Sequence, residues 1–241
     1  MDASWEEFGW ERLGNGIGRR RLPVWDATVT LVAGADSVLL HDTGSSLREG
    51  AEVRAQAQAL LGRRVTHIAL SHPHFDHVLG TAAFAGAEVY GAVGTAELLG
   101  RGGADGLRAD AVRHGMDERD ATAAADALVA PRHQVSGEWT LDLGGGLQVL
   151  LANVGPGHTG HDLAVLVPGS PVVVLCGDLV EESGEPQAGR DAVPSHWPAA
   201  LDRLLELGGE DALYVPGHGA VVDAAFVRDQ RDRLAARFGV S

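Results

Sequence analysis

The sequence predicts an α/β protein built as a sandwich of two β-sheets between layers of helices. Apolar and β-branched stretches fall into two groups, one before residue 91 and one after residue 136, and each group is followed by helix-forming sequence. Each group also ends in short clusters of histidine and aspartate. Strands that end in such clusters at one common edge, with helices following them, predict two sheets whose outer faces are covered by helices.

The length and composition favour a single domain over residues 1–241. A chain of 241 residues fits one large domain or two small ones, and 45% hydrophobic residues can fill a substantial core. The sequence contains no linker or low-complexity tract that would separate two units. One continuous domain is therefore the expected organisation.

The strongly acidic charge argues against nucleic-acid partners. The formal net charge is −14, and all 19 basic residues are arginine. A surface of this sign repels phosphate backbones, so we expect a small-molecule substrate rather than a nucleic acid. The one tight basic run, Arg19-Arg20-Arg21, is typical of the solvated edge of a hairpin.

The amino-terminal sequence and the cysteine content predict a cytoplasmic protein. Residues 1–7 lack the basic start and apolar run of a signal peptide, and no apolar stretch has the length of a membrane span. The single cysteine, Cys176, cannot form an internal disulfide and is expected to be a buried small side chain. We therefore expect no membrane partner, and the sequence predicts no particular oligomeric state.

The first part of the chain predicts a strand group followed by a helix and another strand. Residues 8–42 contain short apolar stretches separated by turns rich in glycine, asparagine and aspartate. Ser45 or Ser46 can cap a helix that Gly62 ends. The β-branched and apolar residues over 65–70 then predict a buried strand.

A cluster of possible metal ligands follows this strand. In extended chain, His72 and His74 point to the same side, roughly 6–7 Å apart along the backbone, so their imidazoles can converge on one cation. Asp76 and His77 come after a turn and face elsewhere. The loop can therefore offer two nitrogens to one metal and an oxygen and a nitrogen to a second. Imidazole and carboxylate are the ligand types of hydrolytic zinc sites.

The chain between the two strand groups predicts mostly helices. Residues 77–99 are expected to form a strand between two short helical segments. Residues 105–128 are rich in alanine, charged and free of proline, which indicates a peripheral helical insertion that can cover the pocket. Its apolar face is thin, so His114 and Met116 are expected at the surface.

The second strand group, over residues 137–175, also leads into polar clusters. The glycine-rich segment 155–162 contains His158 and His161, and its glycines allow the backbone to approach a metal closely. Asp178 follows the last strand of the group, and a carboxylate has two oxygens that can bridge two cations.

The last part of the chain predicts a loop, two helices and a final strand. The loop over residues 181–197 is rich in glutamate, glycine and proline, and Pro198 starts an amphipathic helix. A strand at 211–215 leads to His218 through a Pro-Gly pair. Asp223 caps the carboxy-terminal helix.

Together, these clusters resemble those of the metallo-β-lactamase superfamily. The pattern His-x-His-x-Asp-His at 72–77 is preceded by Asp-Thr-Gly at 42–44 and followed by Gly-His-Thr at 157–159, Gly-Asp at 177–178 and Pro-Gly-His-Gly at 216–219. Each marker alone is weak, but their order is specific and they span most of the chain. The resemblance implies the superfamily's metallo-β-lactamase fold, a four-layer αββα sandwich.

The resemblance also implies a site for two metal ions. In the superfamily pattern, the first ion is bound by His72, His74 and His158, and the second by Asp76, His77 and His218, while Asp178 bridges the two. Asp42 supports the ligand loop by hydrogen bonding without binding metal. Asp76 also orients the nucleophile and relays a proton.

The implied activity is metal-dependent hydrolysis with two Zn²⁺ per chain. When bound, the two cations would supply a hydroxide for attack on a carbonyl carbon or on phosphorus, and one metal would polarise the oxygen of that group. Glutamates in the 181–197 loop disfavour strongly anionic substrates, so we expect a zinc-dependent hydrolase for a neutral or weakly charged ester, thioester or lactone.

Two other activities fit the same resemblance. A mononuclear non-haem iron dioxygenase of the persulfide dioxygenase type keeps only the counterparts of His72, His74, His158 and Asp178, as ligands for one Fe²⁺. A β-lactamase is less favoured, because Asp178 stands where many of those enzymes use cysteine and because a secretion signal is missing.

Two further histidines are candidates for the pocket. His161 stands where the family often has Pro-Gly after Gly-His-Thr, and it could support a ligand, line the pocket or be exposed. His196 and Trp197 close the 181–197 loop, where they could either contact substrate or anchor the loop to the domain.

Overall fold

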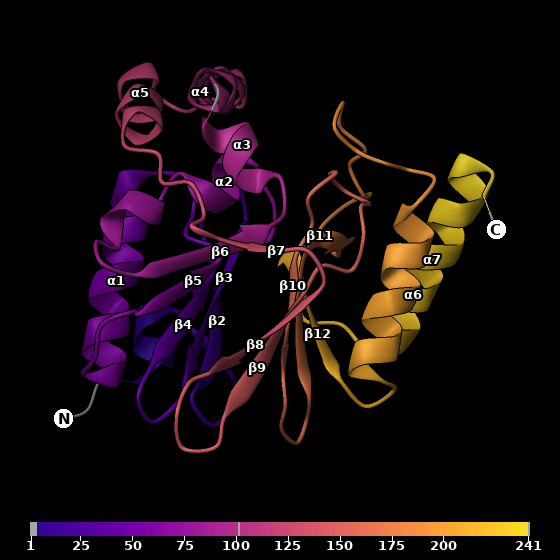
Figure 1. Cartoon of the computed structure of the whole chain (residues 1–241), viewed down its shortest axis with the longest axis horizontal. Helices are drawn as coiled ribbons and strands as arrows, with labels where there is room; N and C mark the ends of the chain where they lie inside the picture. Colours follow the sequence, from indigo (N-terminus) through magenta and orange to yellow (C-terminus); the bar gives the residue numbers. More distant parts are fainter. Residues whose placement is uncertain (1–3, 101, 241) are drawn as a thin grey trace.

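The computed structural model describes residues 4–100 and 102–240 and shows two β-sheets packed face to face between helical layers (Figure 1). The first sheet has its seven strands in sequence order; β1 to β4 are antiparallel and β4 to β7 are parallel. Its strands are β1 (Glu11–Gly14), β2 (Ile17–Arg21), β3 (Thr28–Ala33), β4 (Val38–His41), β5 (His67–Ala69), β6 (Glu88–Ala92) and β7 (His133–Val135).

The second sheet has five strands in the order β12-β11-β10-β9-β8. Neighbouring strands in this sheet are antiparallel, except for β11 and β12, which run parallel and are connected by α6. The strands are β8 (Glu138–Asp142), β9 (Gln148–Ala152), β10 (Ala164–Val167), β11 (Val173–Glu181) and β12 (Leu213–His218).

The helices cover the outer faces of the two sheets and one end of the first sheet. In Figure 1, α1 lies along the first sheet, α6 and α7 lie along the second, and α3 to α5 gather at the end of the first sheet. The α-helices are α1 (Leu47–Leu61), α2 (Phe75–Val78), α3 (Thr95–Gly100), α4 (Gly103–Arg113), α5 (Glu118–Asp126), α6 (Trp197–Gly208) and α7 (Ala224–Phe238).

Three apolar clusters fill the three interfaces between these four layers. Alternation along the strands divides the side chains between them, because successive residues of a strand face opposite sides. In β4, Val38 and Leu40 belong to the cluster on the α1 side, and Leu39 belongs to the cluster between the sheets. In β11, Leu175 faces the other sheet, and Cys176 packs on the α6 side, buried as predicted. The sandwich of two sheets between helices predicted from the sequence is confirmed.

The helix predicted after the first strand group is also confirmed. The side chain of Ser46 accepts a hydrogen bond from the backbone N–H of Glu49, which caps the start of α1. Gly62 ends the helix with a φ of 64°, a left-handed conformation that glycine adopts without steric cost.

The segment over residues 105–128 differs from the prediction in two respects. It contains the separate helices α4 and α5, with Gly115 between them at a φ of 99°. Met116 is buried in the cluster on the α1 side, so its predicted place at the surface was wrong. His114 is exposed, as predicted, and its ring stacks on Phe75 of α2. The two helices therefore pack on the rest of the protein through an apolar surface, which their low overall hydrophobicity did not indicate in the sequence.

The basic run in β2 is only partly a solvated edge. Arg19 is 4% exposed, and its guanidinium pairs with Glu11 at 2.6 Å and donates to the carbonyl oxygen of Gly219 at 2.7 Å. The prediction was wrong for this residue, because Gly219 follows β12 of the other sheet and Arg19 joins the two sheets. Arg21 is exposed, as expected.

The strands β11 and β12 extend further than the sequence predicted. Both Asp178 and His218 lie within strands, so their backbones are held by the β11–β12 ladder. The ladder shifts register near Gly177, which has a φ of 55°. Across residues 4–100 and 102–240, no helix combines the length and apolar character needed to cross a bilayer.

Candidate metal centre

All seven predicted ligands meet at one end of the sandwich, between the two sheets. The first sheet supplies four of them from the segment that follows β5: His72, His74, Asp76 and His77. The second sheet supplies the other three, from the loop after β9, from within β11 and from the end of β12: His158, Asp178 and His218.

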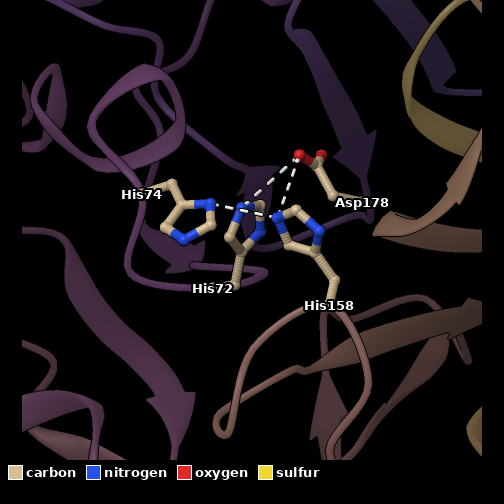
Figure 2. A group of neighbouring side chains, drawn as sticks. All are labelled: His72, His74, His158 and Asp178. Atoms are coloured by element: carbon tan, nitrogen blue, oxygen red, sulfur yellow. Dashed lines mark hydrogen bonds and ion pairs between the residues drawn. The ribbon is translucent and has the colours of Figure 1, made fainter. Parts of the chain in front are cut away.

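Four of these side chains form a first metal position. His72, His74, His158 and Asp178 each offer one ligand atom, and these atoms lie within 4.8 Å of one another (Figure 2). His158 Nε2 lies 3.0 Å from His74 Nδ1. Asp178 Oδ2 lies 3.4 Å from His158 Nε2 and 3.6 Å from His72 Nε2. Three nitrogens and one carboxylate oxygen therefore converge on one point.

A second position lies on the other side of Asp178. Asp76, His77 and His218 also bring one ligand atom each within 4.8 Å of one another. Asp76 Oδ2 is 3.3 Å from His218 Nε2 and 3.5 Å from His77 Nε2. Asp178 Oδ1 is 3.2 Å from His77 Nε2, and Asp178 Oδ2 is 3.4 Å from His218 Nε2. The carboxylate of Asp178 thus touches both groups.

Asp42 orients two of the ligands without joining either group. Its Oδ2 accepts from His77 Nδ1 at 2.9 Å and from Ser71 Oγ at 2.7 Å, and its Oδ1 accepts from the Ser71 backbone N–H at 2.7 Å. Because Ser71 Oγ donates to Asp42, it is left to accept from His72 Nδ1 at 2.8 Å. In both imidazoles, Nδ1 therefore keeps a proton and Nε2 is the nitrogen directed into the site.

Two more ligands are held in the same way by other parts of the chain. His218 Nδ1 donates to the carbonyl oxygen of Trp25 at 2.9 Å, which leaves Nε2 for metal. His74 Nε2 donates to Asp191 Oδ2 at 3.0 Å, which leaves Nδ1 for metal. Sequence reasoning missed Asp191, because nothing in the 181–197 loop distinguishes this carboxylate from its neighbours.

The residues fit a divalent metal such as zinc. Among the described residues, His72 Nε2 and Asp178 Oδ1 are buried atoms without a hydrogen-bond partner. Native structures rarely leave such atoms unsatisfied, and both point into the cluster of ligands. Imidazole nitrogens with a carboxylate oxygen match the ligands that zinc binds.

The electrostatics differ between the two positions. Burial lowers the pKa of His72 well below its usual value and that of His158 to about 4, so both are neutral lone-pair donors. Burial also lowers the pKa of His77 and His218, but the nearby carboxylates of Asp178 and Asp76 together outweigh this effect and raise both pKa values, that of His218 to about 11. The second position therefore has the stronger negative field.

Glu181 is a further carboxylate at the second position that the sequence did not single out. It is buried, and one of its oxygens lies within 4.8 Å of ligand atoms of Asp178 and His218. In a regular strand, residues three apart face opposite sides. The register shift between Gly177 and Glu181 breaks the regular alternation, so Glu181 can face the same site as Asp178. No feature of the sequence indicates this register shift.

The two histidines considered for the pocket lie outside both groups. A ring nitrogen of His161 contacts the carbonyl oxygen of Val93 at 2.7 Å. His196 is exposed, and its Nδ1 lies 3.1 Å from Ser195 Oγ. Trp197, by contrast, is buried, and its indole N–H donates to the carbonyl oxygen of Leu179 at 2.9 Å. Its ring packs edge-on against the imidazole of His158, with 5.5 Å between the ring centroids. Trp197 thus anchors the loop and supports a ligand.

A protein of known sequence is similar to most of this chain. The chain is 29% identical over 196 residues to Metallo-beta-lactamase domain-containing protein 1 of Xenopus laevis, a match that covers 80% of this chain and 71% of that protein.

Solved structures of low sequence identity share the fold. A metallo-beta-lactamase from Pontibacter korlensis superposes with a TM-score of 0.73 at 20% identity, over 93% of this chain and 97% of that one. The metallo-beta-lactamase FIM-1 from Pseudomonas aeruginosa, in its mono-zinc form, superposes with a TM-score of 0.69 at 20% identity, over 95% of each chain.

A family model decides the assignment. The model described as the metallo-beta-lactamase superfamily matches residues 22–218, a range that contains both metal positions, strands β3 to β7 of the first sheet and the whole second sheet. With the αββα sandwich and the cluster of histidines and aspartates, this match shows that the chain belongs to the metallo-beta-lactamase superfamily.

Proposed function

We propose that this chain is a binuclear, zinc-dependent hydrolase that cleaves the ester, thioester or lactone-type carbonyl of a small molecule. The observation that carries this proposal is the position of Asp178. Its two oxygens lie within 3.2–3.6 Å of four imidazole nitrogens that belong to two ligand groups. A carboxylate placed in this way is suited to bridge two cations.

The roles of the residues follow from this geometry. His72, His74 and His158 would hold the first ion, and Asp76, His77 and His218 the second. When bound, the two ions supply a water activated at neutral pH and polarisation of the scissile carbonyl. Asp76 Oδ2 lies 3.5 Å from His77 Nε2 and 3.3 Å from His218 Nε2, and in this proposal Asp76 would orient the nucleophile and accept a proton from it.

The charge around the site supports a neutral or weakly charged substrate. Asp191 reaches His74 from the loop between β11 and α6, and Glu182 and Glu185 lie on the same loop. Arg190 is exposed and is the one basic residue of this segment. A strongly anionic substrate would meet net repulsion there.

The first experiment is metal analysis combined with a substrate panel. Protein reconstituted with zinc should bind close to two ions per chain, and it should hydrolyse at least one of an ester, a thioester and a lactone. A β-lactam belongs in the panel, because the structural relatives carry that name. Absence of bound metal after reconstitution, or activity with none of these carbonyl compounds, contradicts the proposal.

Asp178→Ala tests the bridge directly. Loss of this carboxylate leaves two cations facing each other without compensation. We expect one ion to be lost together with most of the turnover, while the fold measured by circular dichroism is retained. Wild-type metal content and rate in this variant would show that Asp178 is not a ligand.

A mononuclear iron dioxygenase is the second candidate. It is favoured by the first position, where His72, His74, His158 and Asp178 form a complete group on their own. Such an enzyme would be purified with about one iron per chain and would consume dioxygen with a persulfide substrate. Two zinc ions per chain and hydrolysis without oxygen uptake would exclude it.

A further inference from the structure

Glu181 lies beside the second metal position, at the end of β11. It is paired in register with His218 of the parallel neighbour β12, so the two side chains leave the sheet at the same level. Atoms of Glu181, Asp178 and His218 that can bind metal lie within 4.8 Å of one another. This third group shares two residues with the site already described and adds one new carboxylate.

The carboxylate of Glu181 is placed where a charge needs a cationic partner. The residue is 8% exposed, and a buried carboxylate is stable only when it is paired, protonated or bound to metal. Among the described residues, the hydroxyl of Ser183 donates to its Oε1 at 3.0 Å. That contact is made by a neutral group, and the ion pairs among the described residues do not include Glu181.

The backbone around Glu181 is held in place from the opposite side. Its N–H donates to Oε1 of Gln230 at 3.0 Å, and the amide of Gln230 donates to the carbonyl oxygen of Leu179 at 2.7 Å. Gln230 lies on α7 and is fully buried. Residues 179–181 are therefore fixed against α7, and the side chain of Glu181 is presented to the site by a rigid strand rather than by a loop.

From these contacts we infer that Glu181 is an additional ligand of the second metal position and increases its affinity for oxygen-preferring cations such as Mn²⁺. With Glu181, this position has three carboxylates and two imidazoles: Asp76, Asp178, Glu181, His77 and His218. Manganese favours carboxylate oxygen, whereas zinc is satisfied by fewer ligands with more nitrogen. The inference rests on the proposed two-metal site and specifies which ions its second position accepts.

The test compares metal binding by the wild type and by Glu181→Gln. The amide keeps the size of the side chain and its contact with Ser183, but it removes the charged ligand. Titrations with Zn²⁺ or Mn²⁺ alone give the affinity for each ion at each position. We expect the second-position affinity for Mn²⁺ to fall by about 10-fold or more, the affinity for Zn²⁺ to fall less, and the first position to be unchanged.

Two matched variants separate ligation from other effects. Glu185→Gln removes the same charge from an exposed part of the loop and should bind both ions like the wild type. Ser183→Ala removes the hydroxyl but leaves the carboxylate, so it should retain most of the Mn²⁺ affinity. With Co²⁺ at both positions, Glu181→Gln should also change the visible absorption bands, which report the coordination number of that ion.

The outcomes are distinct. If wild-type protein binds two ions and Glu181→Gln binds Mn²⁺ with unchanged affinity, the inference is wrong and the two-metal site stands. An equal loss of affinity in Ser183→Ala and Glu181→Gln would also overturn it, because a hydrogen bond and not ligation would then explain the effect. Binding of a single ion by the wild type would overturn the two-metal proposal and this inference together.

Discussion

A single carboxylate organises much of the ligand geometry. Asp42 accepts three hydrogen bonds, from two atoms of Ser71 and from His77, and through Ser71 it also fixes His72. It has a φ of 57°, a left-handed conformation that aspartate tolerates better than most residues. The backbone turn after β4 thus aims one side chain at ligands of both metal positions.

Replacing this carboxylate should affect both stability and metal binding. Asp42→Ala leaves buried donors without an acceptor, so we expect the free energy of unfolding of the metal-free protein to fall by about 2–4 kcal/mol. Zinc affinity should fall by about 10–100-fold. Urea denaturation and zinc competition titration measure the two effects, and Asp211→Ala, at an exposed position, is the control. Wild-type zinc affinity in Asp42→Ala would contradict the orienting role.

Asp191 should act on metal binding alone. Its side chain is 49% exposed, so Asp191→Asn should change the free energy of unfolding by less than about 0.5 kcal/mol. The charged acceptor that fixes the His74 tautomer is weakened, however, and the zinc affinity of the first position should fall by about 10-fold. Equal affinities in the variant and the wild type would mean that the ligand is oriented without this contact.

At the scale of elements, the segment between β11 and α6 contacts the metal ligands at both of its ends and is mostly exposed to solvent between them. It begins beside Glu181, touches His74 through Asp191 and ends at Trp197, whose indole packs on His158. Its two ends are therefore fixed close to the site, and its exposed middle is available to contact a substrate.

Two substitutions of Trp197 should separate its packing from its hydrogen bond. Trp197→Phe loses the bond to the Leu179 carbonyl, which keeps its contact with Gln230, so we expect a loss of about 1 kcal/mol in the free energy of unfolding. Trp197→Ala leaves a cavity beside His158 and should cost about 3–5 kcal/mol. Urea denaturation measures both, and equal losses would show that packing contributes little.

The strand-end motifs were the most predictable part of the molecule. Their polar residues directly follow apolar stretches in the sequence, and a metal site requires such residues to converge. The order of residues along the chain was therefore enough to predict them as ligands. The resemblance to the superfamily supplied the grouping of the ligands. The structure brings all of these residues together.

The features that could not be predicted from the sequence depend on contacts between segments that are far apart along the chain. Met116 is buried by neighbours on other elements, and Arg19 is buried by Gly219, which is 200 residues away along the chain. Glu181 reaches the site only because β11 continues past Gly177 with a shift in register. Such features leave no periodic signal in the residues themselves.

At the scale of the whole molecule, the metal site joins the two halves of the sandwich. The first sheet contributes His72 and His77, and the second contributes His158, Asp178 and His218. A bound ion therefore links elements that otherwise meet through the apolar cluster between the sheets.

Removal of metal should consequently destabilise the fold. A ligand that binds only the folded state stabilises it by about 2.7 kcal/mol when its free concentration is 100 times its Kd. Thermal unfolding should show a lower Tm in the presence of a chelator, and the Tm should recover when zinc is added in excess of the chelator. A Tm that is independent of zinc would contradict a site shared by the two sheets.

Proton release should accompany binding at the second position. In the metal-free protein, burial lowers the pKa of His218, but the carboxylates of Asp178 and Asp76 together outweigh this effect and raise the pKa to about 11, and the pKa of His77 is raised as well. Metal must displace these protons, so affinity should increase with pH. Calorimetric titration with Zn²⁺ in two buffers of different ionisation enthalpy should give different heats, and identical heats would contradict the prediction.

The same linkage gives the sign of the pH dependence in the absence of metal. A pKa raised from 6.5 to about 11 means that His218 stabilises the metal-free fold most below pH 6.5. This contribution decreases as the pH rises and is lost above about 11. Chemical denaturation at a series of pH values, with a chelator present, measures it.

The division of ligands between the two sheets also has a consequence for the order of folding. The native first position cannot form until His158 and Asp178 have reached the segment after β5, so correct metal capture is a late event. That segment alone has four ligand residues close together, at 72, 74, 76 and 77, and can bind zinc while the rest of the chain is unfolded. Excess zinc during refolding should therefore trap the chain with incomplete coordination, and the ion that completes the native site should slow its assembly.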